Sequence, residues 1–226
     1  MTPYERLAED VASWVDETLA TWEARPIRGH KVIRDGCAGF GLFAPHECNL
    51  IDSPLLQRLR RIHQTALAFL TYPSAVHTRF EHSLGCAILV DRMAAALGTR
   101  GYSVGPVELA HLRMAALLHD CGHLPFSHAA EPVLAQTKLY REAEAEEAAD
   151  AAAAPASAAK FFRRHKEHEI LSHLIIKSEP FSRLWQQIAN MYAPREVGIS
   201  LHDINLDVVA DMVLGKRSDP RMIYHA

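Results

Sequence analysis

The sequence lacks the features of membrane-spanning, secreted and nucleic-acid-coating proteins. No apolar run approaches the roughly 20 residues that a membrane-spanning helix needs. The first residues, MTPYERLAEDVASW, are acidic and amphipathic, without the basic and apolar regions of a signal peptide. The formal net charge is -3, whereas proteins that coat nucleic acids or anionic membranes carry a basic excess. We therefore expect neither a membrane nor bulk nucleic acid as partner, although a small anionic substrate needs only a few local charges.

Cysteine is scarce, and its spacing excludes two common uses. The chain has four cysteines, at Cys37, Cys48, Cys86 and Cys121. None are spaced as a CxxC pair, and four in 226 residues do not form a disulfide framework. We expect reduced thiols in a cytoplasmic protein.

Helical periodicity dominates the chain, with little sign of strands. We expect an all-α fold, a helical bundle with a small irregular or hairpin segment near residues 30–45, where HKVIRDGCAGFGLFAP is rich in glycine. A helix in LIDSPLLQRLRRIHQTA should start at a cap on Asp52 or Ser53. The other clear helices are expected at residues 4–23, 80–97, 107–120, 161–177, 179–192 and 205–215.

One stretch differs in composition from the rest. REAEAEEAADAAAAPASAAK, at residues 141–160, has no large apolar side chain and is interrupted by Pro155. We interpret it as a flexible Ala/Glu-rich insertion in a single domain that spans residues 1–226. A partly helical, solvated segment is the alternative.

The stretch HDCGHLPFSH packs His119, Asp120, His123 and His128 into ten residues. His119 and Asp120 close an otherwise apolar helix, where a desolvated carboxylate is costly without a partner. A divalent cation is such a partner, and a mixed imidazole and carboxylate set suits Fe, Mn, Zn, Ni or Mg. An adjacent pair cannot fill a coordination sphere, so further ligands must come from other helices. A hydrogen-bonded pair without metal is the simpler alternative.

A second polar cluster, HTRFEHSLG, lies about forty residues upstream. Arg79 and His82 are three residues apart and share one helix face. A metal ligand beside an arginine places a cation and a guanidinium over one pocket, which suits a phosphate group. Arg79 could instead pair with Glu81 or another acid.

HTRFEHSLG followed by LLHDCGHLPFSH resembles the HD-domain superfamily of metal-dependent phosphohydrolases. Within it, the sequence is most similar to the deoxynucleoside triphosphate triphosphohydrolase branch. IDSPLLQRLRRIHQ and TYPSA fit that branch's usual entry, and KEHEILSHLI fits its later part. The resemblance covers roughly residues 50–215, apart from 138–160. It implies an HD-domain bundle around a divalent metal ion.

The resemblance also implies what the metal-side residues do. The ligands would be His82, His119 and Asp120, and Arg79 would contact a substrate phosphate. In that branch a water molecule attacks the α-phosphorus of a deoxynucleoside triphosphate, and the nucleoside and intact triphosphate leave. Mn, Fe, Mg, Zn and Ni all suit this ligand set.

Four further residues match the branch's phosphate pocket. His123 and Glu131 would form the acid/base pair at the scissile bond, with His168 in the same pocket. His128 would bind the phosphates. Two plainer roles compete with these, because a histidine after a helix can satisfy free carbonyls and an acid in a first turn complements the helix dipole.

A regulatory site is a further implication. Asp52, Gln57 and Arg60 match positions that help regulated members bind an activating nucleotide between subunits. A helix cap at Asp52 and a solvated QRLRR face are the alternatives. Members of the family are often oligomers, so a homo-oligomer is compatible with the resemblance.

The sequence departs from the family pattern near its end. The family's fourth protein ligand is an aspartate in a DxDxxDYxxRD-like segment after the helix that here ends at Gly215. This chain reads KRSDPRMIYHA there. We expect an HD domain that is C-terminally incomplete relative to the family, with the fourth position filled by water or a substitute such as Asp219. A three-ligand site should hold metal less tightly.

The function expected from these motifs is metal-dependent hydrolysis of a nucleotide phosphoester. The substrate that the resemblance favours is a dNTP, cleaved to deoxynucleoside and triphosphate. Two alternatives stay open: another HD-type nucleotide phosphatase or phosphodiesterase, and a degraded paralogue that binds nucleotide or metal without catalysis.

Overall fold

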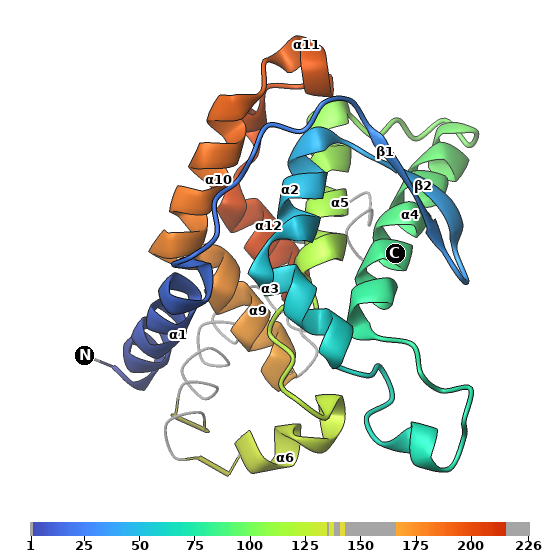
Figure 1. The fold of residues 1–226 in the computed structure, drawn as a ribbon. Coiled ribbons are helices and arrows are strands. Elements are labelled where there is room, and N and C mark those ends of the chain that lie inside the picture. The colour runs from blue at the N-terminus through green and yellow to red at the C-terminus, as the bar shows by residue number, and fades with distance from the viewer. Residues whose placement is uncertain (1, 135, 138–140, 143–165, 216–226) are drawn as a thin grey trace.

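Helices dominate the computed structural model, which describes residues 2–134, 136–137, 141–142 and 166–215. One small hairpin accompanies them (Figure 1), so the prediction of an all-α bundle with a hairpin segment is confirmed. Nearly all of the expected insertion at 141–160 lies outside the described residues, as does Asp219. Within the described part, no helix is long and apolar enough to cross a membrane.

Many helices begin with proline at the first position, where its missing N–H removes no intrahelical hydrogen bond. The α-helices are α1 (Pro3–Leu19), α2 (Pro45–Asp52), α3 (Pro54–Gln57), α4 (Arg79–Gly98), α5 (Pro106–Leu118), α6 (Glu131–Leu134), α9 (Glu167–Lys177), α10 (Glu179–Met191), α11 (Pro194–Val197) and α12 (Leu206–Val213). Short 3-10 turns span Arg58–Arg61, Ala68–Leu70, Ser127–Ala129 and Leu201–Asp203.

The hairpin lies on the outer side of α4 (Figure 1). Its strands, β1 (Lys31–Asp35) and β2 (Gly39–Phe43), pair antiparallel. Gly41 allows the close approach to the helix, because a Cβ atom there would lie 2.3 Å from Cγ1 of Ile88. Phe43, at the end of β2, is fully buried and anchors the hairpin in the core.

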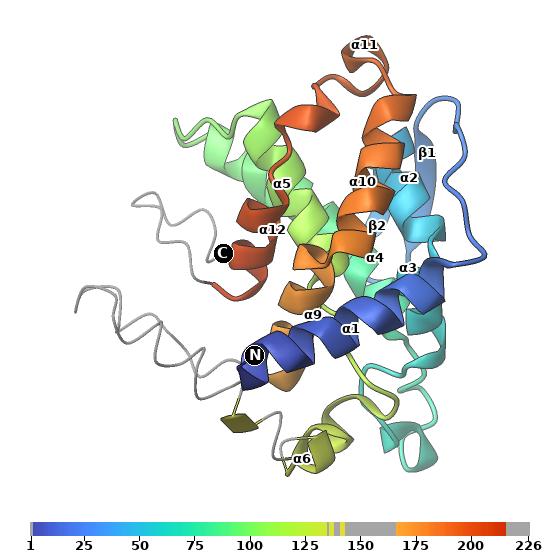
Figure 2. The ribbon, with the colours of Figure 1, turned by 90° about the vertical axis from the view of Figure 1, so that its left-hand side faces the viewer.

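The core forms where four long helices meet. α4 packs along α5, and α12 packs against both α5 and α9. α1 lies across α9 and α10, as Figure 2 shows. The first turn of α4, the end of α5 and the first turn of α9 approach one another at one end of this bundle, and polar side chains from all three gather there.

The start of α4 is fixed by a reciprocal cap. Thr78 Oγ1 accepts a hydrogen bond from the Glu81 N–H, and Glu81 Oε2 accepts one from the Thr78 N–H at 2.7 Å. Glu81 is therefore a helix cap and not the partner of Arg79. The cap holds Arg79 and His82 in the first turn, where both face the end of α5.

The segment where a helix was expected to start at Asp52 or Ser53 contains the end of α2 and the start of the short helix α3. Asp52 is the last residue of α2, so the prediction that it caps a helix start is wrong. Ser53 occupies the position before α3 but donates to the Leu50 carbonyl at 2.6 Å instead of capping. Pro54 explains the break, because a proline disfavours helical backbone in the residue before it.

Candidate metal centre

The turn that follows α5, residues 119–128, is held by Arg58, a half-buried arginine. Arg58 donates from Nη1 to the His123 carbonyl at 2.8 Å and from Nη2 to the Cys121 carbonyl. Its guanidinium also lies 5.0 Å from the ring of Trp14 on α1. These contacts satisfy two carbonyls of the turn itself, beyond the end of the helix, so neither needs a water molecule as its partner.

A serine on α9 ties the same turn to a second helix. Ser172 Oγ accepts from the Gly122 N–H at 2.8 Å and donates to the His119 carbonyl at 2.6 Å. The backbones approach so closely that a Cβ on Gly122 would lie 2.4 Å from the Ser172 nitrogen and 2.5 Å from the His168 oxygen. Gly122 thereby lets His168 reach the side chains of the turn.

His82 and His119 face each other across the gap between α4 and α5. Their Nε2 atoms lie 3.3 Å apart. His119 Nδ1 lies 2.8 Å from the Ala116 carbonyl, which requires a proton on Nδ1 and leaves the Nε2 lone pair free. Burial lowers the pKa of His82, which favours the neutral form that binds metals.

Asp120 lies beneath this pair and is almost completely buried. Its carboxylate accepts from Arg79 Nη1 at 2.8 Å and lies 3.4 Å from His119 Nε2 and 3.8 Å from His82 Nε2. Burial alone would raise the pKa of this carboxyl, but His123, His119 and Arg79 together hold it well below its usual range. Asp120 is therefore ionised.

The residues present fit a divalent cation. Two imidazole nitrogens 3.3 Å apart need a proton or a cation between them, and the ionised Asp120 supplies negative charge beside them. Both nitrogens belong to a group of ligand atoms that all lie within 4.8 Å of one another, and the third member is Cys86. The sequence did not single out Cys86, although its position four residues after His82 places both on one helix face.

The Arg79 guanidinium donates hydrogen bonds to several partners. Besides Asp120, its guanidinium donates to Ser127 Oγ and to the Gln64 carbonyl at 3.3 Å. Phe126 and Ser127 both have positive φ, at 66° and 53°, a costly conformation for residues other than glycine. This strained turn brings the Ser127 hydroxyl to the arginine, a contact that the sequence did not reveal.

The other predicted side chains meet beside Asp120 in what we call the Glu131 cluster: His123, His128, Glu131 and His168. Glu131 Oε1 lies 2.7 Å from His168 Nδ1, 2.8 Å from His128 Nδ1 and 4.0 Å from His123 Nδ1. The rings of His123 and His168 stack with centroids 3.8 Å apart. The structure thus brings together all four residues that the sequence placed in a phosphate pocket.

His123 connects the two groups. Its Nε2 lies 3.4 Å from Asp120 Oδ1, and neither ring nitrogen makes a hydrogen bond within the described residues. Burial lowers the pKa of His123, and burial with the adjacent His123 lowers the pKa of His168 to about 4. Burial alone would raise the pKa of Glu131, but the hydrogen bonds from His168 and His128 outweigh this effect, so the pKa of Glu131 is lowered. The cluster therefore pairs the neutral imidazoles of His123 and His168 with an ionised carboxylate.

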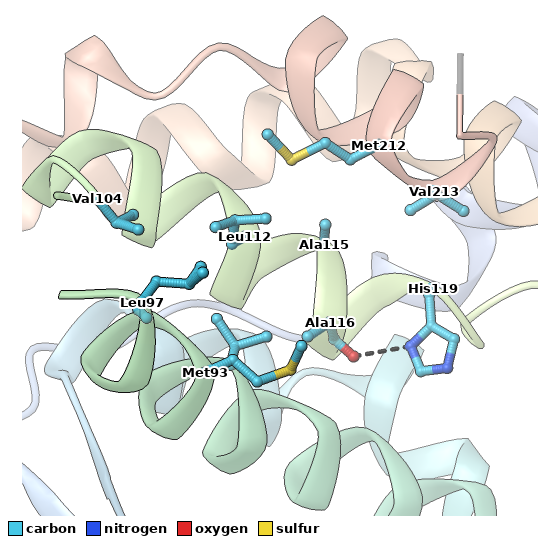
Figure 3. A pocket seen from close by; sticks show the side chains of 11 residues that line it. Met93, Leu97, Val104, Leu112, Ala115, Ala116, His119, Met212 and Val213 are labelled. Atoms are coloured by element: carbon cyan, nitrogen blue, oxygen red, sulfur yellow. Dashed lines mark hydrogen bonds between the residues drawn. The ribbon is translucent and has the colours of Figure 1, made fainter. Parts of the chain in front are cut away.

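An apolar cavity of about 200 Å³ lies between α4, α5 and α12 and reaches His119 (Figure 3). Met93, Leu97, Leu112 and Met212 contribute to its wall, and among the described residues His119 is the only polar side chain in the lining. Charged phosphates are unsuited to such a wall, whereas the Glu131 cluster lies on the other side of Asp120.

The predicted regulatory residues lie outside this site. Asp52 forms an exposed ion pair with Lys31, at 3.8 Å. Gln57 donates to the Ile51 carbonyl and accepts from Arg60 Nε at 2.7 Å. The Arg60 guanidinium lies 3.7 Å from the centre of the Phe80 ring, next to Arg79 in sequence.

A family model described as the HD domain matches residues 79–204, more than half of the chain. The chain belongs to the HD domain family. The match begins at Arg79, in the first turn of α4, and includes the candidate metal centre and the Glu131 cluster. It confirms the resemblance that the sequence motifs indicated.

Several proteins are similar to part of this HD domain. An uncharacterized protein of Methanocaldococcus jannaschii is 48% identical over 101 residues, which cover 45% of this chain and 21% of that protein. Deoxynucleoside triphosphate triphosphohydrolase SAMHD1 of Bos taurus is 39% identical over 100 residues, or 43% of this chain and 17% of that protein. The human SAMHD1 match is also 39% identical and covers 16% of that protein.

Two solved structures share the fold over most of this HD domain. A phosphohydrolase of Bacteroides thetaiotaomicron superposes with a TM-score of 0.56 and 26% identity, covering 87% of this chain and 37% of that chain. A hypothetical protein of Aquifex aeolicus gives 0.56 and 27%, covering 87% and 41%. The matched part thus spans less than half the length of each of these relatives and structures.

Proposed function

We propose that this HD domain hydrolyses nucleotide phosphoesters with a divalent metal ion, and that its substrate is a deoxynucleoside triphosphate. One observation carries the proposal: the metal-binding nitrogens of His82 and His119 and the Glu131 cluster lie on either side of one buried, ionised Asp120. The similarity to SAMHD1, named a deoxynucleoside triphosphate triphosphohydrolase, supports the choice of substrate.

His82, His119 and Asp120 would hold the metal. When bound, a divalent ion supplies Lewis acidity that polarises a phosphoryl oxygen. Arg79 and His128 would bind phosphate oxygens. Because the Arg79 guanidinium is bonded to Asp120, Ser127 and Gln64, one of these hydrogen bonds must be exchanged for a phosphate oxygen.

The Glu131 cluster would move the protons. Water adds to the α-phosphorus as the bond to the 5′-oxygen breaks, giving deoxynucleoside and triphosphate. Glu131 would accept the proton of the water, and His123, 4.0 Å from Glu131 Oε1, would take up this proton and deliver it to the leaving 5′-oxygen. His168, stacked on His123 and bonded to Glu131, would keep both in place.

The test is a hydrolysis screen of the purified chain with Mn, Fe, Mg, Zn and Ni against the four dNTPs, with products separated by chromatography. We expect inorganic triphosphate and deoxynucleoside in equal amounts. His119→Ala should lose both metal and activity, whereas His202→Ala, at an exposed histidine of a 3-10 turn, should retain them.

Other outcomes separate the alternatives. If the chain releases orthophosphate, or cleaves a cyclic nucleotide or a nucleoside monophosphate, its activity is that of another HD-type phosphatase or phosphodiesterase. The proposed release of triphosphate would then be wrong. Metal binding without any cleavage would indicate a non-catalytic paralogue. A chain that binds no divalent metal and cleaves no nucleotide would refute the proposal.

Regulation is a separate part of the proposal. Asp52, Gln57 and Arg60 would bind an activating nucleotide between two copies of the chain. The Asp52–Lys31 ion pair and the Gln57–Arg60 hydrogen bond are exposed and easily exchanged, whereas Gln57 would keep its bond to the Ile51 carbonyl and Arg60 would have to leave the Phe80 ring. Light scattering with and without dGTP tests this, because assembly that Arg60→Ala abolishes would support the site. Unchanged mass with every nucleotide would contradict it.

A further inference from the structure

The turn between His123 and His128 places one hydroxyl group against the guanidinium of Arg79. Ser127 is 1% exposed, and its Oγ accepts hydrogen bonds from Arg79 Nε at 3.1 Å and from Arg79 Nη2. The hydroxyl itself donates to the Gln64 carbonyl at 3.3 Å. Because a hydroxyl has one hydrogen to donate and two lone pairs that accept, these three bonds use its full capacity.

The carbonyl that accepts from Ser127 is fixed by backbone hydrogen bonds. The Gln64 N–H donates to the His77 carbonyl at 3.0 Å, just before α4 begins. Ser127 therefore links a fixed carbonyl to the guanidinium and sets the plane in which the guanidinium lies. The hydrogen bond from Arg79 Nη1 to Asp120 does not set this plane, because a single contact leaves rotation about it free.

The turn holds this arrangement at a conformational cost. Phe126 and Ser127 are consecutive residues with φ of 66° and 53°, and only glycine adopts such backbone without a penalty. In the 3-10 turn that follows, successive side chains point about 120° apart. Ser127 thus faces Arg79 while His128 faces Glu131. Strain of this kind is typical of functional sites.

We propose that Ser127 is a positioning residue, which holds the Arg79 guanidinium in the orientation that receives a substrate phosphate. The proposal rests on the proposed function, in which Arg79 exchanges one hydrogen bond for a phosphate oxygen. The bond to be exchanged is the longest, from Nη2 to the Gln64 carbonyl at 3.3 Å. Ser127 and Asp120 keep Nε and Nη1 in place, so the freed Nη2 N–H meets the phosphate in a fixed direction.

The first experiment compares Ser127→Ala with Ser127→Gly. Both remove the hydroxyl, but glycine also removes the strain at positive φ, so Ser127→Gly should unfold at a higher temperature than Ser127→Ala. We expect both variants to lose kcat/KM for dNTP hydrolysis by more than about tenfold, the loss that corresponds to one hydrogen bond to a charged group. Both should bind zinc as the wild type does, because the partners of the hydroxyl are Arg79 and Gln64.

Ala66→Gly is the matched control, because Ala66 has the same φ of 53°. This variant should unfold at a higher temperature than the wild type, with unchanged kcat/KM. If Ser127 served only to stabilise the fold, activity would follow stability, and Ser127→Gly would be more active than Ser127→Ala. That result, or wild-type kcat/KM in Ser127→Ala, would overturn the proposal.

A second experiment asks whether Ser127 acts through Arg79. Lysine keeps the positive charge but lacks the Nε–H and Nη2 groups that donate to Ser127. In an Arg79→Lys chain, Ser127→Ala should therefore reduce kcat/KM by less than about twofold, whereas it costs more than about tenfold in the wild type. Additive losses would overturn the proposal, since Ser127 would then act independently of Arg79.

Binding without turnover separates this role from the proposed hydrolysis. With a chelator present, the wild type should bind inorganic triphosphate, and Ser127→Ala should bind it more weakly by more than about tenfold. Isothermal titration calorimetry measures both affinities. Equal affinities, or no binding by the wild type, would overturn the role of Ser127. Wild-type chain that binds triphosphate but cleaves no dNTP would overturn the proposed hydrolysis and leave the role of Ser127 in phosphate binding standing.

Discussion

Asp120 shows how one side chain combines stability and chemistry. It is 1% exposed, yet ionised, because Arg79 and the neighbouring histidines compensate the loss of water. Arg79, at 3% exposure, depends equally on Asp120. Removing either charge leaves the other buried and uncompensated.

We therefore predict that Asp120→Asn, which preserves the shape, destabilises the chain by about 3–5 kcal/mol even without metal. Urea unfolding in the presence of a chelator measures this. The control is Asp207→Asn, which removes an exposed ion pair to Lys177 and should cost under about 1 kcal/mol. Equal losses of unfolding free energy in the two variants would show that the ion pair between Asp120 and Arg79 does not stabilise the fold.

His46 is a buried histidine outside the metal centre. Its ring lies edge-on to Trp185 with centroids 6.2 Å apart, and the charged or titratable groups near it are Glu47, Arg113 and His30. Burial lowers the pKa of His46, although Glu47 opposes the shift. The folded chain thus holds this imidazole neutral.

This shift makes stability depend on pH. In the unfolded chain, His46 has a pKa of about 6.5 and binds a proton below that pH, whereas the buried His46 of the folded chain stays neutral. The free energy of unfolding therefore decreases as the pH falls from about 6.5 toward the lower pKa of the folded state. We predict that His46→Phe reduces this decrease in urea unfolding between pH 7 and pH 5. His202→Phe, at an exposed site, should leave it unchanged. A pH profile identical in wild type and His46→Phe would contradict the prediction.

At the scale of elements, the contact between the turn after α5 and α9 has no room for a side chain. The two nearest atoms that a Cβ on Gly122 would meet belong to the backbone of Ser172 and His168, which cannot rotate away, and the third is the Leu171 Cβ at 2.7 Å. The placement of the His168 ring against the His123 ring depends on this close contact between the two backbones.

Gly122→Ala should therefore destabilise the fold by roughly 1–3 kcal/mol and weaken metal binding, because α9 must shift. Gly36→Ala is the matched control, since a Cβ there meets nothing within 4 Å, and should stay within about 0.5 kcal/mol. Urea unfolding and zinc titration measure the two effects. Wild-type behaviour of Gly122→Ala in both would refute the close-contact argument.

Elements with strong local signals were predictable from the sequence. The apolar segments at 80–97 and 107–120 lie within one or two residues of α4 and α5, and the segment expected at 205–215 contains α12, which Asn205 caps by accepting a hydrogen bond from the Asp207 N–H at 2.8 Å. α2 was missed because its eight residues follow the hairpin directly and carry polar residues that are buried only by tertiary contacts.

Those contacts are what a sequence alone does not contain. Glu47 in α2 is buried because Arg113 of α5, 66 residues away, donates to it from Nε at 2.6 Å and Nη2 at 2.9 Å. In the site, motif spacing indicated His82, Arg79 and the Glu131 cluster. The sequence did not indicate the roles of Arg58 and Ser172, because their side chains form hydrogen bonds with backbone atoms of the turn. Backbone carbonyls and N–H groups leave no trace in residue identities.

For the whole molecule, metal binding and folding should be linked. The proposed ligands come from α4 and from the end of α5, so the unfolded chain cannot present them together. At a metal concentration about 100 times the Kd, a ligand that binds only the folded state adds about 2.7 kcal/mol of stability.

We predict that saturating zinc raises the midpoint of thermal unfolding and that a chelator reverses the increase. His119→Ala should show no zinc-dependent shift, whereas His202→Ala should behave as the wild type. Differential scanning calorimetry measures all three. A shift of the same size in His119→Ala would place the stabilising metal elsewhere.

The turn after α5 is fixed by partners that are distant along the chain. Arg58 reaches it across 65 residues, Ser172 across 50 and Arg79 across 48. Helices such as α4 and α5 form from local contacts, whereas contacts of this separation require loop closure and arise more slowly. During refolding, the helical signal should return first, and the capacity to bind zinc should appear only when the last of these distant segments has docked.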